Sequence, residues 1–419
     1  MLAAALWTLA SAGTQDVAAT QPPPPPPPSL VVVGIDAFRP DYLERANVPA
    51  IRALAARGVR AQGLIPPFPS KTFPSFVTIA TGLRPARHGI LNNTIDDPAI
   101  PVRFRLSDHP GRSDPRWWLG EPIWNTAERQ GVRAAGIFWP GDDAEILGRR
   151  PSSYLTYDES FPNEQRIDRA LSLLAEPAAT RPWLVMLYVS LVDDASHAHG
   201  PHAPEAHAAA AAADALVARL LAGLESRGLT STVNVAVVSD HGMAETTPDR
   251  VIVLDDYVDP ASVDVIETGP SVRLRPLDEA TLSLEERRRW TVQTLRALRG
   301  KHPRLRVYPG TALPPRFQAG TSVRIPPVVG MADDGWLVLT REQLQRWRER
   351  GGETRGEHGF APGLPSMHGV FVAAGPSFRV GMRLPAVESI HLYEAFCRVL
   401  GLTPGPNDGN QRVLARATR

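Results

Sequence analysis

Residues 30–36 have the sequence Leu30-Val31-Val32-Val33-Gly34-Ile35-Asp36, and this stretch decides the fold of the 419-residue chain. Its apolar run is continuous and mostly β-branched, which predicts a short strand buried on both faces. Comparable runs recur, with helical patterns between them. Strands that alternate with helices predict an α/β domain with a doubly wound, mostly parallel sheet flanked by helices. The other predicted strands are residues 133–139, 183–192, 233–238 and 369–374, and the predicted helices are 50–57, 167–174, 204–224, 284–298 and 390–400.

The segments before this strand predict an exported protein. Residues 1–12 are small and apolar and end in Ala10-Ser11-Ala12, which is typical of a signal peptide with its cleavage site, although a positively charged start is missing. Residues 13–29 include Pro22 to Pro28, a proline run that favours an extended linker. We therefore expect a secreted or periplasmic location, with a tail on a cytosolic protein as the alternative.

The folded domain is expected over residues 30–408. Between about residues 277 and 337 the alternation of strands and helices weakens, and Arg-rich and Pro-rich stretches such as Glu286-Arg287-Arg288-Arg289 and Ile325-Pro326-Pro327 replace it. We expect a small cap-like insertion there, with short antiparallel strands.

Composition and charge limit the possible partners. With 43% hydrophobic residues, 21% charged residues and a net charge of +1, the chain has no strong overall field. We therefore expect no stable complex with nucleic acid. No stretch of about 20 apolar residues is recognised after the N-terminus, so we expect no transmembrane segment. Because Cys397 is the only cysteine, an internal disulfide is excluded and any metal must be held by histidines and carboxylates.

Acidic and histidine residues follow three of the predicted strands. Asp36 comes directly after the first, Asp193 and His197 follow the 183–192 run, and Asp240 and His241 follow the 233–238 run. In an open parallel sheet, ligands bind beyond the carboxyl ends of the strands. Each of these residues alone would more often be a turn former or helix cap. Their joint placement predicts a metal site at this edge of the sheet.

Thr72, in Lys71-Thr72-Phe73-Pro74-Ser75, is the candidate nucleophile. A threonine hydroxyl is a weak nucleophile at neutral pH and needs a metal or a base to activate it. Pro74 is typical of a helix start, so Thr72 is expected at the positive end of a helix, where a phosphoryl oxyanion is favoured. The alternative is that Thr72 simply caps this helix.

Taken in order, these features resemble the nucleotide pyrophosphatase/phosphodiesterase family of the alkaline phosphatase superfamily. The resemblance spans nearly all of residues 30–400 and implies an alkaline phosphatase-like fold, with residues 30–408 forming the phosphodiesterase catalytic domain. The motifs that carry it are Val33-Gly34-Ile35-Asp36, Lys71-Thr72-Phe73-Pro74, Gly82-Leu83-x-Pro85-x-x-His88-Gly89-Ile90, Phe138-Trp139-Pro140-Gly141, Tyr188-x-x-x-x-Asp193-x-x-x-His197-x-x-Gly200-Pro201, Ser239-Asp240-His241-Gly242-Met243 and Gly356-Glu357-His358-Gly359-Phe360.

The resemblance implies two Zn²⁺ ions as cofactors. One zinc would be bound by Asp36, Thr72, Asp240 and His241, and the other by Asp193, His197 and His358. His358 is identified only through the resemblance, because its surroundings have the composition of a glycine-rich loop. His368 is a rival ligand, although it lies where the family varies.

The resemblance also implies a substrate site. Asn93 matches the family asparagine that donates to a phosphoryl oxygen, and Phe73 and Tyr157 match positions whose rings enclose a nucleobase. Stacking of this kind contributes about 1–3 kcal/mol per base and tolerates different sequences. Ordinary core or lid packing is the alternative for both rings.

The expected function is two-zinc hydrolysis of phosphodiester or pyrophosphate bonds of small-molecule nucleotides, through a covalent phospho-threonine on Thr72. A phosphomonoesterase or a lysophospholipase-type phosphodiesterase of the same superfamily is the main alternative, and a non-catalytic metal-binding relative is another. A sulfatase is disfavoured because Thr72 cannot become formylglycine. Several departures from the family pattern lie near the site and leave substrate preference open: Ser75-Phe76, Val192-Asp193-Asp194 and Asp96-Asp97.

Overall fold

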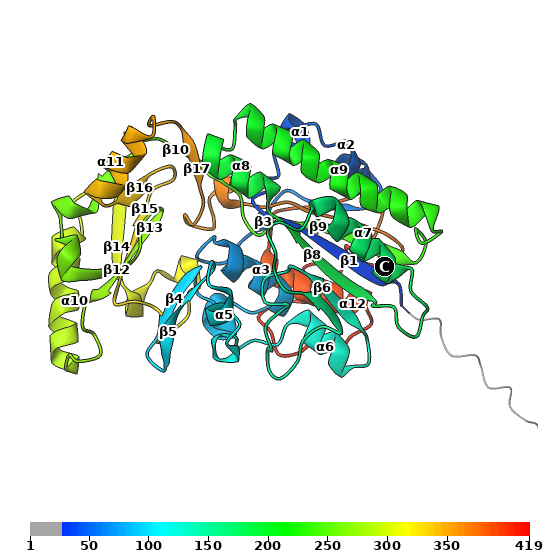
Figure 1. Cartoon of the computed structure of the whole chain (residues 1–419), viewed down its shortest axis with the longest axis horizontal. Coiled ribbons are helices and arrows are strands. Elements are labelled where there is room, and N and C mark those ends of the chain that lie inside the picture. The colour runs from blue at the N-terminus through cyan, green and yellow to red at the C-terminus, as the bar shows by residue number, and fades with distance from the viewer. Residues whose placement is uncertain (1–26) are drawn as a thin grey trace, which may run out of the picture.

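The computed structural model describes residues 27–419. An eight-stranded sheet forms the centre of the larger lobe, in the order β19-β2-β18-β9-β1-β8-β6-β7 (Figure 1). Strands β9, β1, β8, β6 and β7 are parallel, whereas β18 is antiparallel to both of its neighbours. The predicted doubly wound, mostly parallel sheet is confirmed. Its strands are β1 (Ser29–Ile35), β2 (Val59–Ala61), β6 (Ala134–Ile137), β7 (Ser153–Leu155), β8 (Leu184–Val189), β9 (Val233–Val238), β18 (Phe371–Ala374) and β19 (Met382–Leu384).

Helices cover both faces of this sheet (Figure 1). Because successive side chains of a strand point to opposite faces, β1 contributes to two cores: Leu30 and Val32 to one, and Val31, Val33 and Ile35 to the other. This division explains why the strand is apolar throughout. The first core is completed by α3 (Thr72–Thr81), α6 (Ile123–Arg129) and α12 (Leu392–Val399), and the second by α2 (Pro49–Ala56), α7 (Asn163–Leu174) and α9 (Pro204–Ser226).

Gly34 allows α3 to lie directly against β1. A Cβ atom at this position would be 2.7 Å from the Phe76 ring and 2.9 Å from the Trp139 ring, which is closer than real contacts permit. The close approach sets the first turn of α3 beside the carboxyl end of β1, where Asp36 follows. A glycine in the strand therefore positions Thr72 relative to Asp36.

The smaller lobe is built on a four-stranded antiparallel sheet in the order β12-β13-β15-β14. Antiparallel strands were predicted near residues 277–337, but β12 (Val263–Glu267) and β13 (Ser271–Pro276) precede that range. Charged residues in these two strands concealed them from the sequence pattern. The other elements of this lobe are α10 (Leu284–Leu298), β14 (Leu305–Pro309), β15 (Val328–Ala332), β11 (Val251–Val253), β16 (Leu337–Leu339) and α11 (Arg341–Glu349).

A partly buried carboxylate joins the two lobes. Glu267 of β12 accepts hydrogen bonds from Asn92 Nδ2 at 2.9 Å and Ser271 Oγ at 2.7 Å, and it forms ion pairs with Arg273 at 3.1 Å and Lys71 at 3.7 Å. Lys71 immediately precedes Thr72. The smaller lobe is therefore tied to the residue beside the candidate nucleophile.

Helix α9 also satisfies the length and composition of a membrane span. Its best 18-residue window has a mean hydropathy of 1.3, and 39% of that window is buried in the fold. The apolar character of this helix comes largely from alanine, which gives it no run of large apolar side chains in the sequence. Leu216, Val217, Leu220 and Leu224 of this helix are buried in the second core, where the helix packs against the sheet. A core helix passes the same test as a membrane span, so the match is weak evidence for membrane insertion.

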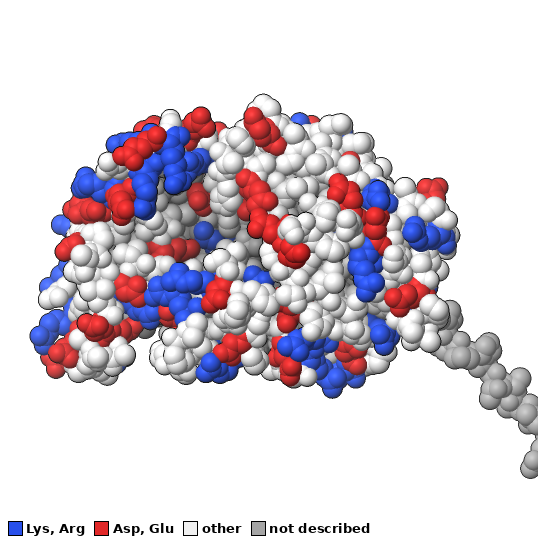
Figure 2. Space-filling model, in the orientation of Figure 1, with Lys and Arg blue, Asp and Glu red and all other residues white. Residues whose placement is uncertain are grey.

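Two features predicted at the N-terminus cannot be compared with the fold. The predicted signal peptide, residues 1–12, and most of the predicted linker, residues 13–29, lie outside the described residues. On the face of the described part shown in Figure 2, basic and acidic side chains are intermixed. This mixture agrees with the small net charge.

Candidate active site

The predicted metal-ligand residues converge beyond the carboxyl ends of β1, β8 and β9. Asp36 follows β1, and Asp240 and His241 follow β9. Asp193 and His197 lie on α8 (Leu191–His199), which begins two residues after β8 ends and presents them one helical turn apart. The prediction that the strand extends to residue 192 is wrong, because Val192 is buried as part of α8 and not as part of the sheet.

Asp36, Asp240 and His241 form one candidate ligand set. His241 Nε2 lies 3.0 Å from Asp240 Oδ2 and 3.4 Å from Asp36 Oδ1, and all three side chains are buried. Ala37 adopts a left-handed backbone conformation with φ of 54° directly after Asp36, and its N–H donates to Asp240 Oδ1 at 3.2 Å. A strained residue thus links the ends of the two strands.

Asp193, His241 and His358 form a second set that shares His241 with the first. His358 lies in the loop after β17 (Arg355–Glu357), and its ring stacks on that of His241 with 3.7 Å between centroids. His358 Nε2 is 3.9 Å from Asp193 Oδ1, and His197 Nε2 is 3.4 Å from the same oxygen. His197 therefore adjoins this set without belonging to it.

The three histidines are oriented alike by backbone carbonyls. A carbonyl can only accept a hydrogen bond, so the Nδ1 atom of each ring carries the proton and the Nε2 lone pair faces the cluster. This is the tautomer that a metal ligand requires. The Nδ1 contacts are His197 with Gly356 O at 3.0 Å, His241 with Gly242 O at 2.9 Å, and His358 with Ser70 O at 3.0 Å.

The carboxylates of the site are crowded. Burial raises the pKa of Asp36 well above its usual value, and the charges of Asp240 and Asp193 raise it further. The pKa of Asp240 is raised well above its usual value by burial and then by Asp193. Burial likewise raises the pKa of Asp193. Like charges gathered in a buried site favour the binding of a cation.

The donor set of this site fits a metal ion. Asp36 Oδ1, Asp193 Oδ1 and Asp240 Oδ2 are buried and have no hydrogen-bond partner among the described residues. Each of these oxygens lies 3.0–3.9 Å from the Nε2 atom of a histidine. Both atoms of each pair carry lone pairs and neither carries a proton, which is the arrangement expected when a cation binds between them. Histidine and carboxylate ligands without thiolates suit Zn²⁺ among the divalent ions.

Thr72 is the first residue of α3, and its hydroxyl is directed into the cluster. Lys71 occupies the capping position, and no side chain caps the helix. Thr72 Oγ1 lies 3.3 Å from His241 Nε2 and is 6% exposed. The alternative that Thr72 serves as the helix cap is therefore wrong, and the hydroxyl is free for chemistry at the positive end of the helix.

The candidate nucleophile and part of the ligand cluster line a pocket of about 710 Å³. Phe73, Asn93 and Tyr157, the residues that the resemblance assigns to the substrate, line the same pocket. Asn93 Oδ1 accepts the N–H of Phe73 at 3.1 Å, so its NH₂ group is the end available to a ligand. The structure thus brings a hydroxyl, an amide donor and two aromatic rings together around one cavity.

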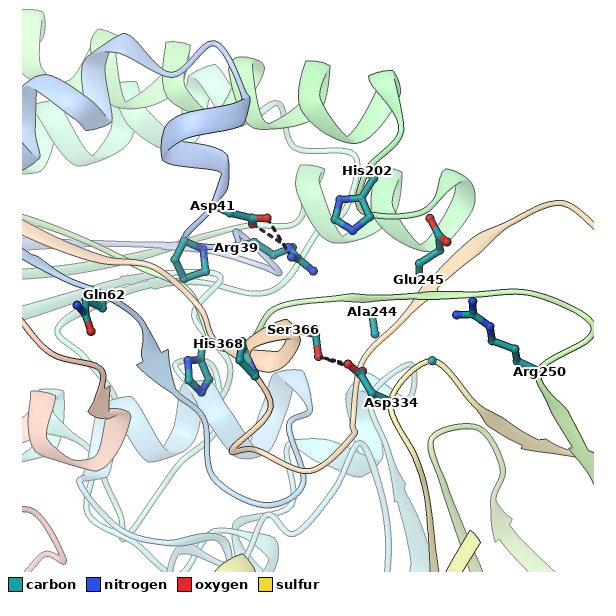
Figure 3. A pocket seen from close by; sticks show the side chains of 13 residues that line it. Arg39, Asp41, Gln62, His202, Ala244, Glu245, Arg250, Asp334, Ser366 and His368 are labelled. Atoms are coloured by element: carbon teal, nitrogen blue, oxygen red, sulfur yellow. Dashed lines mark hydrogen bonds and ion pairs between the residues drawn. The ribbon is translucent and has the colours of Figure 1, made fainter. Parts of the chain in front are cut away.

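His368, the rival ligand, faces a different hollow. Figure 3 shows it with Arg39, Asp41 and His202 around a cavity of about 460 Å³. The ion pair between Arg39 and Asp41 and the hydrogen bond from Ser366 to Asp334 lie in this second hollow. His368 is absent from both ligand sets.

Sequence reasoning assigned no function to several residues of the pocket. Tyr188 donates its hydroxyl to Asp36 Oδ2 at 2.7 Å. His109, Arg112 and Asp143 line the pocket near the two aromatic rings. Tyr188 is part of one of the motifs that carry the family resemblance, whereas no local pattern marks the other three residues.

Fold and site together define an alkaline phosphatase-like α/β protein, with a hydroxyl and two overlapping ligand sets beyond the carboxyl ends of its strands. The model of the type I phosphodiesterase / nucleotide pyrophosphatase family matches residues 30–361. The chain belongs to this family, as the resemblance of its motifs implied.

Relatives and solved structures agree with this assignment. Venom phosphodiesterase CdcPDE of Crotalus durissus collilineatus is 34% identical over 403 residues, covering 94% of this chain and 47% of the relative. Ectonucleotide pyrophosphatase/phosphodiesterase family member 3 of Rattus norvegicus is 34% identical over 92% of this chain and 43% of the relative. The chain therefore spans less than half the length of these curated relatives.

The structure of murine ectonucleotide pyrophosphatase/phosphodiesterase 5, an inactive threonine-to-alanine variant in complex with AMP, is similar with a TM-score of 0.85 and 31% identity. The match covers 94% of this chain and all of that one. The human counterpart gives the same TM-score at 30% identity.

Proposed function

We propose that this chain hydrolyses phosphodiester and pyrophosphate bonds of nucleotides, with Thr72 as the nucleophile and two Zn²⁺ ions as cofactors. The observation that carries the proposal is the position of Thr72 Oγ1, at the start of α3 and 3.3 Å from a histidine shared by both ligand sets. Membership of the type I phosphodiesterase / nucleotide pyrophosphatase family supports it.

Two ions would divide these residues between them. Asp36, Asp240, His241 and Thr72 would bind one ion, and Asp193, His197 and His358 the other. His241 also lies within reach of Asp193 and His358, so the two ions would be neighbours. When bound, the ions neutralise the crowded carboxylates and act as Lewis acids that favour ionisation of the Thr72 hydroxyl and polarise the phosphoryl group.

The proposed reaction proceeds in two displacements at phosphorus. Thr72 Oγ1 loses its proton to solvent and forms a bond to phosphorus, while the bond from phosphorus to the leaving oxygen breaks and that oxygen takes up a proton. Water then attacks the phospho-threonine, breaks the Oγ1–phosphorus bond and restores the hydroxyl. The NH₂ group of Asn93 and the N-terminus of α3 stabilise the charge on the other phosphoryl oxygens.

The substrate class is proposed from the aromatic rings beside the nucleophile. Phe73 and Tyr157 line the pocket that contains Thr72, and rings so placed can stack a nucleobase. The murine neighbour bound AMP, which supports a nucleotide in this pocket. We propose a small-molecule nucleotide as the substrate.

A substrate panel tests the reaction class. We expect kcat/KM for a nucleotide diester to exceed that for a phosphate monoester, a lysophospholipid and a sulfate ester, because discrimination follows differential binding of the transition state. A higher kcat/KM for the monoester would instead indicate a phosphomonoesterase, and a higher kcat/KM for the lysophospholipid would indicate a lysophospholipase-type phosphodiesterase. Turnover of none of the four would support a non-catalytic metal-binding protein.

Removing the hydroxyl of Tyr188 is expected to weaken metal binding. Tyr188 donates to Asp36 Oδ2 and leaves Oδ1 without a hydrogen bond, so it orients the carboxylate toward the site. Loss of such a partner typically reduces metal affinity by about 10- to 100-fold. The Tyr188→Phe variant is titrated against a zinc chelator, with Tyr154→Phe, an exposed tyrosine, as control. Equal zinc affinity in Tyr188→Phe and the wild type would rule out this role.

We also propose that the protein is exported. The apolar start and the Ala10-Ser11-Ala12 sequence support a signal peptide at residues 1–12, followed by a linker at 13–29 and the catalytic domain at 30–408. A relative named as a venom enzyme agrees with an extracellular location. N-terminal sequencing of the protein recovered outside the producing cell is expected to begin at Gly13.

A further inference from the structure

A buried arginine–aspartate pair lies in the substrate pocket and has no part in the proposed reaction. Arg112 Nη2 is 3.9 Å from Asp143 Oδ2, and the two side chains are 11% and 6% exposed. Both residues line the same cavity as Thr72. A charged pair kept in a largely buried position is costly unless its remaining hydrogen-bonding groups are satisfied.

The guanidinium group of Arg112 lies beside both aromatic rings. Its guanidinium carbon lies 5.8 Å from the centroid of Phe73 and 5.4 Å from that of Tyr157. Nη1 donates to Leu106 O at 2.7 Å, and the Trp118 indole donates to Arg112 O at 2.8 Å. These contacts fix the backbone and one nitrogen of Arg112. The other guanidinium N–H groups have no hydrogen-bond partner among the described residues, and Arg112 lines the pocket, so they are available to a ligand there.

Asp143 presents an acceptor beside this donor. Its Oδ2 atom accepts from His109 Nε2 at 2.8 Å and from the backbone N–H of Tyr157 at 3.4 Å, and it is also the oxygen that Arg112 approaches. All of these contacts use Oδ2. Asp143 Oδ1 is therefore the carboxylate oxygen available to a ligand.

From this arrangement we propose that Arg112 and Asp143 read the edge of the nucleobase and select a 6-oxopurine, guanine or hypoxanthine. A 6-oxopurine offers the acceptors O6 and N7, which an arginine binds in bidentate fashion. It also offers the donor N1–H, adjacent to O6, which suits Asp143 Oδ1. The inference deepens the proposed function and rests on a nucleotide being bound between Phe73 and Tyr157.

The other bases match this pair less well. Adenine carries an amino group at position 6, so a base in the same pose directs N–H groups at the Arg112 donors and an unprotonated N1 at the Asp143 acceptor. Pyrimidines lack the N7 acceptor that completes the bidentate contact. A buried polar group left unpaired by the wrong base is the general source of strong discrimination.

Inosine and adenosine 5′-(p-nitrophenyl) phosphates test this proposal, because the two substrates differ only at the edge that Arg112 and Asp143 face. For the wild-type full chain, kcat/KM is expected to be about tenfold or more higher for the inosine ester. In Arg112→Met this ratio is expected to fall by about threefold or more, since the bidentate donor is lost while Asp143 still accepts from N1–H. Arg105→Met, an exposed arginine on β5 (Ile100–Arg105), is the matched control and keeps the wild-type ratio.

Two further measurements keep the outcome decisive. The wild-type protein is also assayed with the 7-deazainosine ester, which lacks N7. Its kcat/KM is expected to fall most of the way from the value for the inosine ester to the value for the adenosine ester, although the protein is unchanged. Wild-type turnover of bis(p-nitrophenyl) phosphate, which has no base, tests the proposed function separately. If the wild type hydrolyses this diester but shows a kcat/KM ratio near one for the inosine and adenosine esters, the base-reading role is overturned and the proposed function is not. An unchanged ratio in Arg112→Met would do the same.

Discussion

Thr72→Ala is expected to lower kcat/KM for a nucleotide diester by about four orders of magnitude or more, as the loss of a nucleophile does in other hydrolases. The same variant is expected to retain its zinc, because Asp36, Asp240 and His241 remain to bind the ion. The measurements are single-substrate kinetics and elemental analysis of the purified protein. Near-wild-type turnover would remove Thr72 from the reaction.

The fold should tolerate this substitution, so a loss of activity can be attributed to chemistry. Thr72 makes no capping hydrogen bond at the start of α3, and its hydroxyl faces the ligand cluster. The change in the free energy of unfolding is expected to be within about 1 kcal/mol. Thr72→Ser, which keeps a hydroxyl at the same position, is the matched control and should recover a measurable part of the activity. A large drop in Tm would instead point to a structural role.

The main sheet was predictable because its strands are buried on both faces and are therefore apolar throughout. Strands β1, β9 and β18 lie within one or two residues of the predicted runs, and α10 has the predicted bounds. The smaller sheet was not predictable to the same degree. The partly buried Glu267 of β12 and the buried Arg273 of β13 form an ion pair across the strands. A sequence pattern cannot recognise a charge whose partner lies on another strand.

The residues of the site likewise fall into those that the sequence could predict and those that it could not. Asp36, Asp193 and Asp240 could be assigned to one edge because the carboxyl ends of parallel strands meet there. His358 follows a two-stranded antiparallel ribbon far along the chain, so only the resemblance identified it. Arg112 lies on the four-residue helix α5 (His109–Arg112), and its partner Asp143 follows β6. Contacts between such distant segments are set by tertiary packing, which no local pattern encodes.

Under the proposed two-zinc assignment, Asp193→Ala is expected to release one ion and to lower kcat/KM by about three orders of magnitude, since one of the two proposed Lewis acids is lost. Asp193 belongs to the second ligand set, and the same carboxylate oxygen lies near both His197 and His358. Elemental analysis should give about half of the wild-type zinc content. Unchanged zinc in the variant would contradict the assignment of this ligand.

Asp193→Ala should also affect Tm differently without and with metal: Tm should not fall in the metal-free protein, but the rise in Tm on adding zinc should be smaller. In the metal-free protein the charge of Asp193 raises the pKa of both Asp36 and Asp240, so removing it relieves repulsion and should leave Tm equal to or above that of the metal-free wild type. Zinc binds the native state and raises Tm by mass action, and with one site lost this rise should shrink. Asp194→Ala, the adjacent exposed aspartate, is the matched control and should keep the full rise. A lower Tm without metal and an undiminished rise with zinc would mean that Asp193 is a structural residue and that the second ion, if bound, is held by other ligands.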